Sequence, residues 1–155
     1  RTRRTVSFLR RMFSGPKRRD FSHPVLGTLE LVKGRDGFSW ISADLTPHGV
    51  SASIRVREGQ TPSLEQARFY ERWVSTPLDA FRLVEPHIAP QFEAATGSAL
   101  PPDWRAVLEL SGVGVPLDAS VQNSWDISFQ HKALGWIFTC YFNEEGHDVK
   151  VGIDT

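Results

Sequence analysis

The sequence predicts an α+β fold with a largely antiparallel sheet, in which three strands precede two central helices and three or four strands follow them. Near both ends of the chain, apolar residues alternate with polar ones, as they do in strands with one buried face. In the middle of the chain, apolar residues recur at the spacing of amphipathic helices instead. Strands, then helices, then strands make an α+β arrangement.

The first three strands are expected at residues 25–32, 38–43 and 50–56. A glycine-containing loop separates the first two and suits a hairpin. If Leu31 faces Phe38, the apolar residues of both strands share one side of the pair. These residues are Leu29, Leu31, Phe38 and Trp40. The third strand alternates apolar residues with Ser and Arg, which predicts that one of its faces is exposed to solvent.

Two helices are expected next, each opening at a Thr-Pro pair. Thr61-Pro62 and Thr76-Pro77 each have the pattern of an N-cap residue followed by proline at the first helical position. Asp79 stands three residues after Thr76 and completes a capping-box pattern.

Prolines interrupt the second predicted helix. Pro86 and Pro90 are expected to kink or split it before Gly97 ends it. Residues 99–116 remain ambiguous, because 102–104 can open a short helical turn while the apolar residues that follow look extended.

The C-terminal segment predicts three antiparallel strands joined by four-residue loops at 132–135 and 143–146. Pairing Phe129 with Phe138, and Phe138 with Val151, aligns the apolar positions, and a slip of one residue would turn them all outward. The core face is then Trp125, Ile127, Phe129, Trp136, Phe138, Cys140, Phe142, Val149, Val151 and Ile153. The other face carries the rows Asp126–Tyr141–Asp148 and Ser128–Thr139–Lys150.

Charge divides the chain into two parts. The first nineteen residues hold eight of the eighteen basic side chains and no acidic one, whereas residues 20–155 hold ten bases and eighteen acids. We therefore predict a basic, flexible tail over 1–19 and a single α+β domain over 20–155. An amphipathic basic helix in the tail is the alternative.

Several classes of protein and site are not predicted. No apolar run approaches the ~20 residues that cross a bilayer, and Arg10 and Arg11 interrupt the apolar part of the tail, which disfavours a secretory signal. The single cysteine, Cys140, is expected in the core of a cytoplasmic protein. The five histidines are dispersed and lack zinc-site spacing, and no phosphate-binding loop occurs, so we predict no metal and no cofactor. His131 and His147 are interpreted as histidines at the edge of the core.

The most enzyme-like group is the predicted row of Asp126, Tyr141 and Asp148. Paired carboxylates can separate their pKa values and act as general acid and base. Glu144 and Glu145 stand nearby at the hairpin tip. A solvated polar face is the simpler interpretation, and on that interpretation the acidic residues are candidate contacts to a protein partner: Asp126, Glu144, Glu145 and Asp148.

Two short motifs resemble those of a group of small bacterial proteins of unknown function. The chain reads F-S-H-P-V-L-G at 21–27, with Trp40 thirteen residues later, and G-H-D-V-K-V-G-I-D at 146–154. The group ends in I-D-G, where this chain has Thr155. The resemblance implies an association with toxin–immunity gene neighbourhoods, and it implies no catalytic residues.

Three function hypotheses follow. The first is a non-catalytic acidic interaction domain, such as an antitoxin-like immunity protein, whose negative charge steers it to a basic partner such as a nuclease. The second is a small hydrolase or lyase that uses Asp126, Tyr141 and Asp148. The third is contact with nucleic acid or an anionic membrane through the tail. Its candidate residues are Arg3, Arg4, Arg10, Arg11, Lys17, Arg18 and Arg19.

Overall fold

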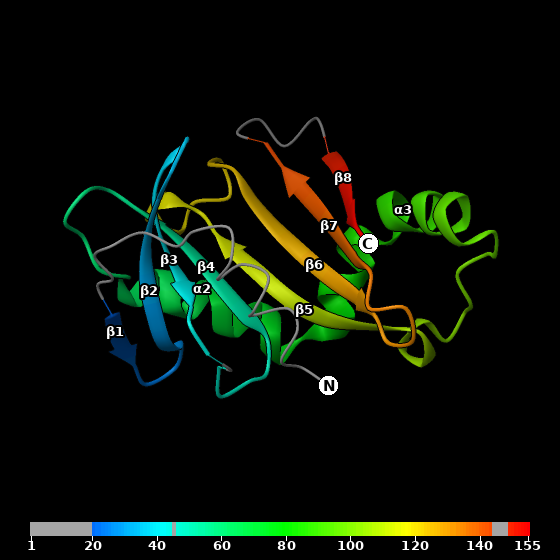
Figure 1. Ribbon diagram of the computed structural model, residues 1–155, viewed down its shortest axis with the longest axis horizontal. Coiled ribbons are helices and arrows are strands. Elements are labelled where there is room, and N and C mark those ends of the chain that lie inside the picture. The colour runs from blue at the N-terminus through cyan, green and yellow to red at the C-terminus, as the bar shows by residue number, and fades with distance from the viewer. Residues whose placement is uncertain (1–19, 45, 144–148) are drawn as a thin grey trace.

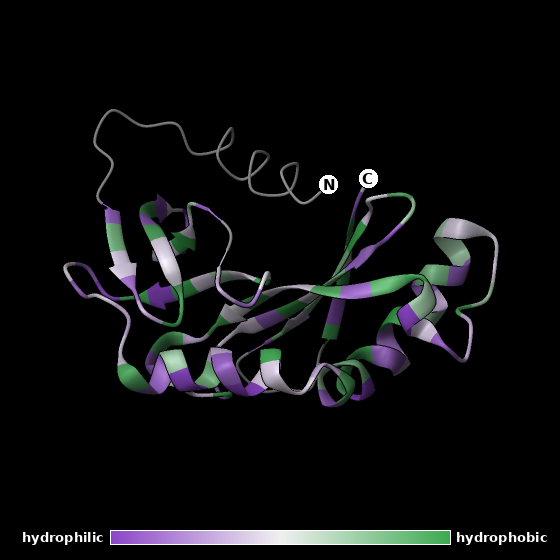
Figure 2. Ribbon diagram, turned by 90° about the horizontal axis from the view of Figure 1, so that it is seen from below, coloured by the Kyte–Doolittle hydropathy of each residue, from purple (hydrophilic) through white to green (hydrophobic). Residues whose placement is uncertain are grey.

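A computed structural model describes residues 20–44, 46–143 and 149–155, in which eight strands form one sheet (Figure 1). The helices α2 and α3 both lie on one side of this sheet (Figure 2). The strands are β1 (Asp20–His23), β2 (Gly27–Gly34), β3 (Gly37–Ser42), β4 (Ser51–Val56), β5 (Leu108–Val115), β6 (Trp125–His131), β7 (Ile137–Phe142) and β8 (Val149–Asp154). The helices are α2 (Leu64–Ser75) and α3 (Pro77–Thr96), and two 3-10 turns are η1 (Trp104–Ala106) and η2 (Leu117–Ala119).

The spatial order of the strands equals their order in the chain. Every neighbouring pair is antiparallel except β4 and β5, which are parallel and are connected through α2 and α3. The predicted α+β class with a largely antiparallel sheet is confirmed. Four strands rather than the predicted three precede the helices, because residues 20–23 form β1, and four strands follow them. The predicted basic tail at 1–19 lies outside the described residues. Within those residues, no helix has the length and apolar character needed to cross a membrane.

The N-terminal hairpin differs from its prediction in register. Leu31 lies opposite Trp40, and Lys33 opposite Phe38, so the predicted pairing of Leu31 with Phe38 is wrong by two residues. The cause is a tight turn, in which Gly34 pairs directly with Gly37 and Gly37 takes a φ of 112°. A shift of two residues keeps every side chain on its predicted side of the pair.

The start of α2 also differs from its prediction. The N-cap is Ser63 rather than Thr61, and a complete capping box joins Ser63 to Gln66. Thr76 is the N-cap residue of α3 with Pro77 at the first helical position, as predicted. Its hydroxyl donates to the carbonyl of Arg72, however, so the predicted capping box of Thr76 with Asp79 is wrong.

The prolines do not split α3, which is one helix from Pro77 to Thr96 with Pro86 and Pro90 inside it. A proline removes one backbone hydrogen bond, but the apolar face of α3 packs on the sheet and offsets that loss. Its buried residues are Ala80, Phe81, Val84, Ile88 and Phe92. Gly97 ends the helix in a left-handed conformation with φ of 77°, as predicted.

The segment at 99–116 contains both predicted features, since η1 is followed directly by β5. The predicted pairing of Phe129 with Phe138 is confirmed, but Phe138 lies opposite Ile153 rather than Val151. The apolar set still faces the core, again because the shift is two residues.

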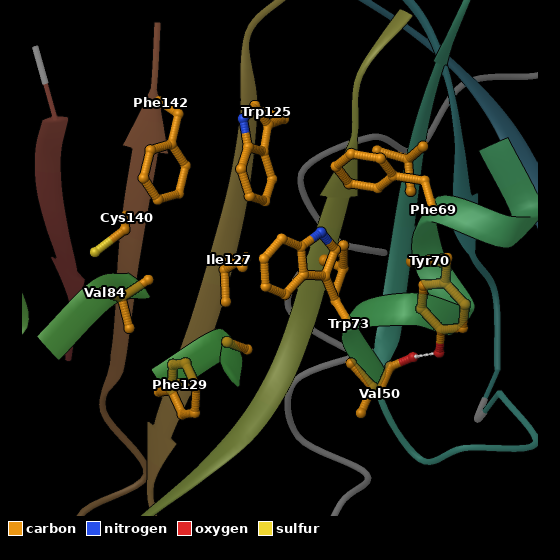
Figure 3. Close-up of a cluster of buried hydrophobic side chains, with 14 of the residues drawn as sticks. Val50, Phe69, Tyr70, Trp73, Val84, Trp125, Ile127, Phe129, Cys140 and Phe142 are labelled. Carbon is orange, nitrogen blue, oxygen red and sulfur yellow. Dashed lines mark hydrogen bonds between the residues drawn. The ribbon is translucent and has the colours of Figure 1, made fainter. Parts of the chain in front are cut away.

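The core between sheet and helices is rich in stacked aromatic rings (Figure 3). Trp73 of α2 stacks on Trp125 of β6 with centroids 5.5 Å apart, and Trp125 stacks on Phe142 at 4.5 Å. The Tyr70 hydroxyl donates to the carbonyl of Val50, which ties α2 to the start of β4. These contacts fix the helix layer on one face of the sheet and leave the other face for polar residues.

Cys140 is fully buried in this core, as predicted. Burial raises the pKa of its thiol to about 12, so the thiolate that would act as a nucleophile is suppressed at neutral pH.

Candidate functional site

The side of the sheet turned away from α2 and α3, which we call the outer face, carries one row of directly opposed residues across all eight strands. Asp126 of β6 belongs to this outer row, with Tyr141 of β7 next to it and Lys150 of β8 beyond. In order from β1 to β8, the outer row is Asp20, Glu30, Ile41, Ser53, Gly114, Asp126, Tyr141 and Lys150.

Asp126 lies flat against the neighbouring strand because Gly114 leaves room for it. A Cβ placed on Gly114 would lie only 2.1 Å from Oδ2 and 2.5 Å from Cγ of Asp126. Packing against the backbone of β5 removes water from the carboxyl group, and this burial raises its pKa to about 6, an effect partly opposed by the positive charge of Arg55. Asp126 is therefore a carboxyl group that exchanges its proton close to neutral pH.

Tyr141 is the large exposed side chain of this part of the face, with 48% of its surface accessible. Its ring lies over Gly152, where a Cβ would be 3.0 Å from Cε2 of the tyrosine. Partial burial raises the pKa of the phenol, the negative charges of Asp126 and Asp154 raise it further, and a hydrogen bond with Thr139 opposes them. The phenol stays protonated at neutral pH and can donate a hydrogen bond.

A second row of small side chains borders this pair. The hydroxyl groups of Ser128 and Thr139 are hydrogen bonded to each other at 2.8 Å, and Gly112 lies opposite Ser128. Carboxyl, phenol and hydroxyl groups thus share one patch, in which Thr139 is buried and Tyr141 is exposed. We define this candidate site as Asp126, Ser128, Thr139 and Tyr141.

The predicted row of Asp126, Tyr141 and Asp148 is correct for its first two members and wrong for the third. Asp126 and Tyr141 are direct cross-strand neighbours, but Lys150 occupies the position opposite Tyr141. The cause is the two-residue shift of β8, which replaces an acidic neighbour by a basic one. Asp148 itself lies outside the described residues, as do two further predicted contacts, Glu144 and Glu145.

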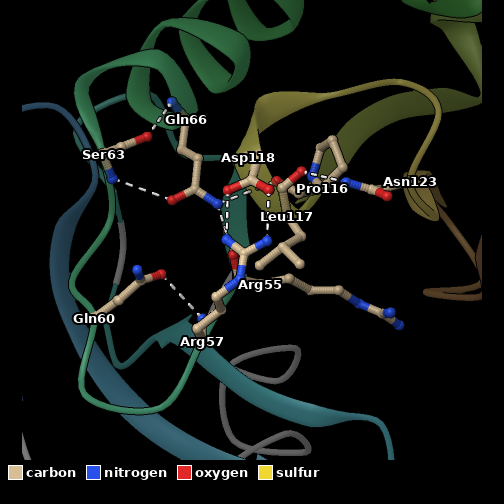
Figure 4. A network of polar contacts seen from close by, with 9 residues as sticks. All are labelled: Arg55, Arg57, Gln60, Ser63, Gln66, Pro116, Leu117, Asp118 and Asn123. Atoms are coloured by element: carbon tan, nitrogen blue, oxygen red, sulfur yellow. Dashed lines mark hydrogen bonds and ion pairs between the residues drawn. The ribbon is translucent and has the colours of Figure 1, made fainter.

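An ion pair that the sequence does not indicate lies at the far end of β4 (Figure 4). Nη1 and Nη2 of Arg57 donate to Oδ1 and Oδ2 of Asp118 at 2.6 and 2.8 Å. The bidentate pair lowers the pKa of the Asp118 carboxyl and raises that of Arg57. The two residues are sixty-one positions apart, and only the parallel pairing of β4 with β5 brings them together.

The turn that carries Asp118 is strained. Asp118 and Ala119 both have left-handed backbones, with φ of 56° and 54°. Side chains from two other elements hold the turn: Gln66 donates to the carbonyl of Pro116, and Asn123 donates to that of Leu117.

A polar hollow of about 400 Å³ lies beside this turn, lined in part by Gln60, Ser63, Gln66 and Asp118. The Gln66 amide also donates to the carbonyl of Arg55 and accepts from the N–H of Ser63. Its hydrogen bonds are therefore committed to the fold, and we place the candidate site on the outer face instead.

His131 has structural contacts. His131 stacks on Phe92 with centroids 5.8 Å apart, and its Nδ1 accepts from the N–H groups of Ala133 and Leu134, which confirms its predicted place at the edge of the core. His147, which is predicted to have the same place at the edge of the core, lies outside the described residues. Across residues 20–44, 46–143 and 149–155, no three His, Cys, Asp or Glu side chains are grouped to hold a metal ion.

Comparisons with protein-family models, with curated proteins and with solved structures found no match to this chain.

Proposed function

We propose that this protein is a non-catalytic binding module that holds a basic protein partner against the outer face of its sheet. The observation that carries the proposal is the pairing of Asp126 with Tyr141. A desolvated carboxyl group beside a half-exposed aromatic ring offers a partner both charge and contact area. Tyrosine is enriched in protein interfaces for this reason.

The charge of the chain from residue 20 onward supports a basic partner. Eighteen acids against ten bases steer a positively charged protein toward this part of the molecule. Packing against Gly114 removes water from the Asp126 carboxyl group. A lysine or arginine side chain of the partner would contact that carboxyl group in place of the lost water. The carboxyl group would then be ionised at neutral pH in the complex, because an opposite charge lowers its pKa.

A role as an antitoxin-like immunity protein is part of the same proposal. The motifs at 21–27 and 146–154 resemble those of proteins from toxin–immunity gene neighbourhoods. A nuclease toxin would suit the acidic surface, because contacts to nucleic-acid phosphates are made by Lys and Arg side chains. A cytoplasmic location is part of this proposal, since the single buried thiol of Cys140 suits a reducing compartment.

The test is site-specific photo-crosslinking in the source organism, with a photoreactive residue in place of Tyr141. The matched control carries it in place of Leu83, an apolar residue of α3 that is 38% exposed on the helix side. We expect position 141 to capture one basic protein that position 83 does not capture. That protein, purified, should bind less tightly when salt is raised from about 50 to about 500 mM, which shortens the Debye length roughly threefold.

Two isosteric variants sharpen the result. D126N removes the charge at the site, whereas D79N makes the same change on the exposed first turn of α3. Binding of the captured partner should weaken about tenfold or more in D126N and stay unchanged in D79N. Equal capture at positions 141 and 83, or equal binding by the two variants, would refute the proposal.

Proton transfer is a second candidate function, favoured by one observation. A carboxyl group with a pKa of about 6 is suited to act as a general base near neutral pH, and Tyr141 is a neighbouring proton donor. Activity on small ester, phosphoester or glycoside substrates should then rise with an inflection near pH 6 and vanish in D126N. Turnover that persists in D126N would assign the activity elsewhere.

A further inference from the structure

The strand β8 forms one border of the sheet (Figure 1). Among the strands that the structure describes, it pairs with β7 alone, over its full length from Val149 to Asp154. Its other side therefore presents backbone N–H and C=O groups to which a further strand can add. At the opposite border, β1 has four residues, against six in β8.

The sequence of β8 is complementary to itself. In an antiparallel pairing of two copies centred on Gly152, Lys150 of each copy stands opposite Asp154 of the other. Both side chains are exposed. The twofold axis doubles this contact into two ion pairs. Opposite charges in direct cross-strand positions stabilise a sheet, whereas like charges there destabilise it.

The apolar positions agree with the same register. Val151 of one copy lies opposite Ile153 of the other, and both are partly buried on the helix side of the sheet. The pairing thus keeps polar residues on the outer face and apolar residues on the helix side in both copies. Gly152 at the centre adds no side chain that would separate the two strands.

We propose that a second copy of this chain binds the β8 edge in antiparallel register about Gly152, which joins the two sheets into one. The pairing also places a charge near the candidate site. Asp154 lies close enough to Tyr141 to act on the phenol electrostatically, so the second copy brings its Lys150 to the border of each site. The interface is independent of the basic partner proposed above.

The experiment measures self-association of the full chain by sedimentation equilibrium across the micromolar range. It compares the wild type with K150E, D154K and the double reversal K150E/D154K. The control is K33E, which makes the same charge change on an exposed lysine of β2. The unfolding midpoint of each variant is measured first. We expect it to match that of the wild type, since these positions are on the surface.

We expect a wild-type dimer. Each single reversal turns two attractive pairs into two repulsive ones and should weaken the dimer by about tenfold or more. The double reversal restores opposite charges in both pairs and should regain most of the lost affinity, while K33E should match the wild type. Amide hydrogen exchange should slow in β8 of the concentrated wild type and not in K150E.

Three results would overturn the proposal. They are a wild type that stays monomeric across this range, a dimer that K150E leaves intact, and a double reversal that dissociates as readily as the single variants. The crosslinking test at Tyr141 reports on the basic partner and is read separately.

Discussion

The carboxyl group of Asp126 occupies the space that a side chain on Gly114 would need. The two residues face each other on β5 and β6, and a Cβ on Gly114 would come within 2.1 Å of Oδ2 of Asp126. The position of the acid at the candidate site is thus set by the absence of a side chain on the next strand.

Substituting Gly114 by alanine should destabilise the fold, because the new methyl group displaces the Asp126 carboxyl group or the backbone beneath it. We expect the free energy of unfolding to fall by about 1–3 kcal/mol. Urea denaturation measures the change. In a D126A background the same substitution should cost clearly less, since the clashing group is gone. A G114A penalty that is identical in both backgrounds would mean that the contact is not responsible.

The stability of the protein should depend on the protonation of Asp126. Aspartate has an ordinary pKa of 3.8, and burial raises that of Asp126 to about 6. Between these values the folded state holds a proton that the unfolded chain releases, so the free energy of unfolding falls as pH rises from about 4 to about 6. D126N lacks this dependence. From about pH 4 to about pH 6, the unfolding free energy of D126N should therefore increase relative to that of the wild type, by up to about 3 kcal/mol in total. Above that range the difference should stay constant.

The variant D118N provides a control of opposite sign. The guanidinium of Arg57 lowers the pKa of Asp118, so that carboxylate stabilises the fold above its ordinary pKa, and the stabilisation disappears as pH falls below about 4. Parallel stability profiles for D126N and the wild type from pH 4 to 6 would contradict the prediction for Asp126.

Two buried tryptophans differ in one hydrogen bond and should respond differently to replacement by phenylalanine. Nε1 of Trp40 donates to the carbonyl of Gln60 at 2.8 Å, whereas Nε1 of Trp73 is buried without an acceptor among the residues that the structure describes. W40F leaves a carbonyl group without its donor, while W73F removes a donor that has no partner. We expect W40F to lose about 1 kcal/mol more unfolding free energy than W73F, by chemical denaturation. An equal or larger loss in W73F would count against this account.

The strained turn at Asp118 and Ala119 should accept glycine. Ala119 has a φ of 54°, a conformation that costs an alanine about 1–2 kcal/mol and that glycine adopts without steric strain. A119G should therefore be at least as stable as the wild type. A89G, in the interior of α3, should lose about 1 kcal/mol. Thermal unfolding of both variants checks the contrast, which fails if A119G is the less stable of the two.

The alternation of apolar residues predicted which side each strand buries, but it did not distinguish between strand pairings that differ by two residues. A period of two makes such a shift invisible to the pattern. Phe138 could thus be opposed to Val151 or to Ile153 with the same apolar face, and the chain adopts the second pairing. The tight turn at Gly34 and Gly37 similarly decides the first hairpin.

The same limit explains what was predicted of the candidate site. Asp126 and Tyr141 come from one short hairpin, so local pairing was enough to place them together. Gly114, against which the Asp126 carboxyl group packs, comes from residues 99–116, where the sequence pattern did not decide between helix and strand. The ion pair of Arg57 with Asp118 depends on the parallel pairing of β4 with β5 and has no local signal.

The parallel contact of β4 with β5 has a consequence for how the protein is made. Among β2 to β8, every strand except β5 pairs with a strand that is synthesised shortly before it. The parallel partner of β4, which is β5, leaves the ribosome only after residues 57–107. During that interval the nascent chain carries a hairpin stack with one unfinished border at Ser51–Val56. We expect chaperones to bind the newly synthesised chain at this border. We also expect misassembly to begin there, because an unpaired apolar strand can pair with another chain and start aggregation.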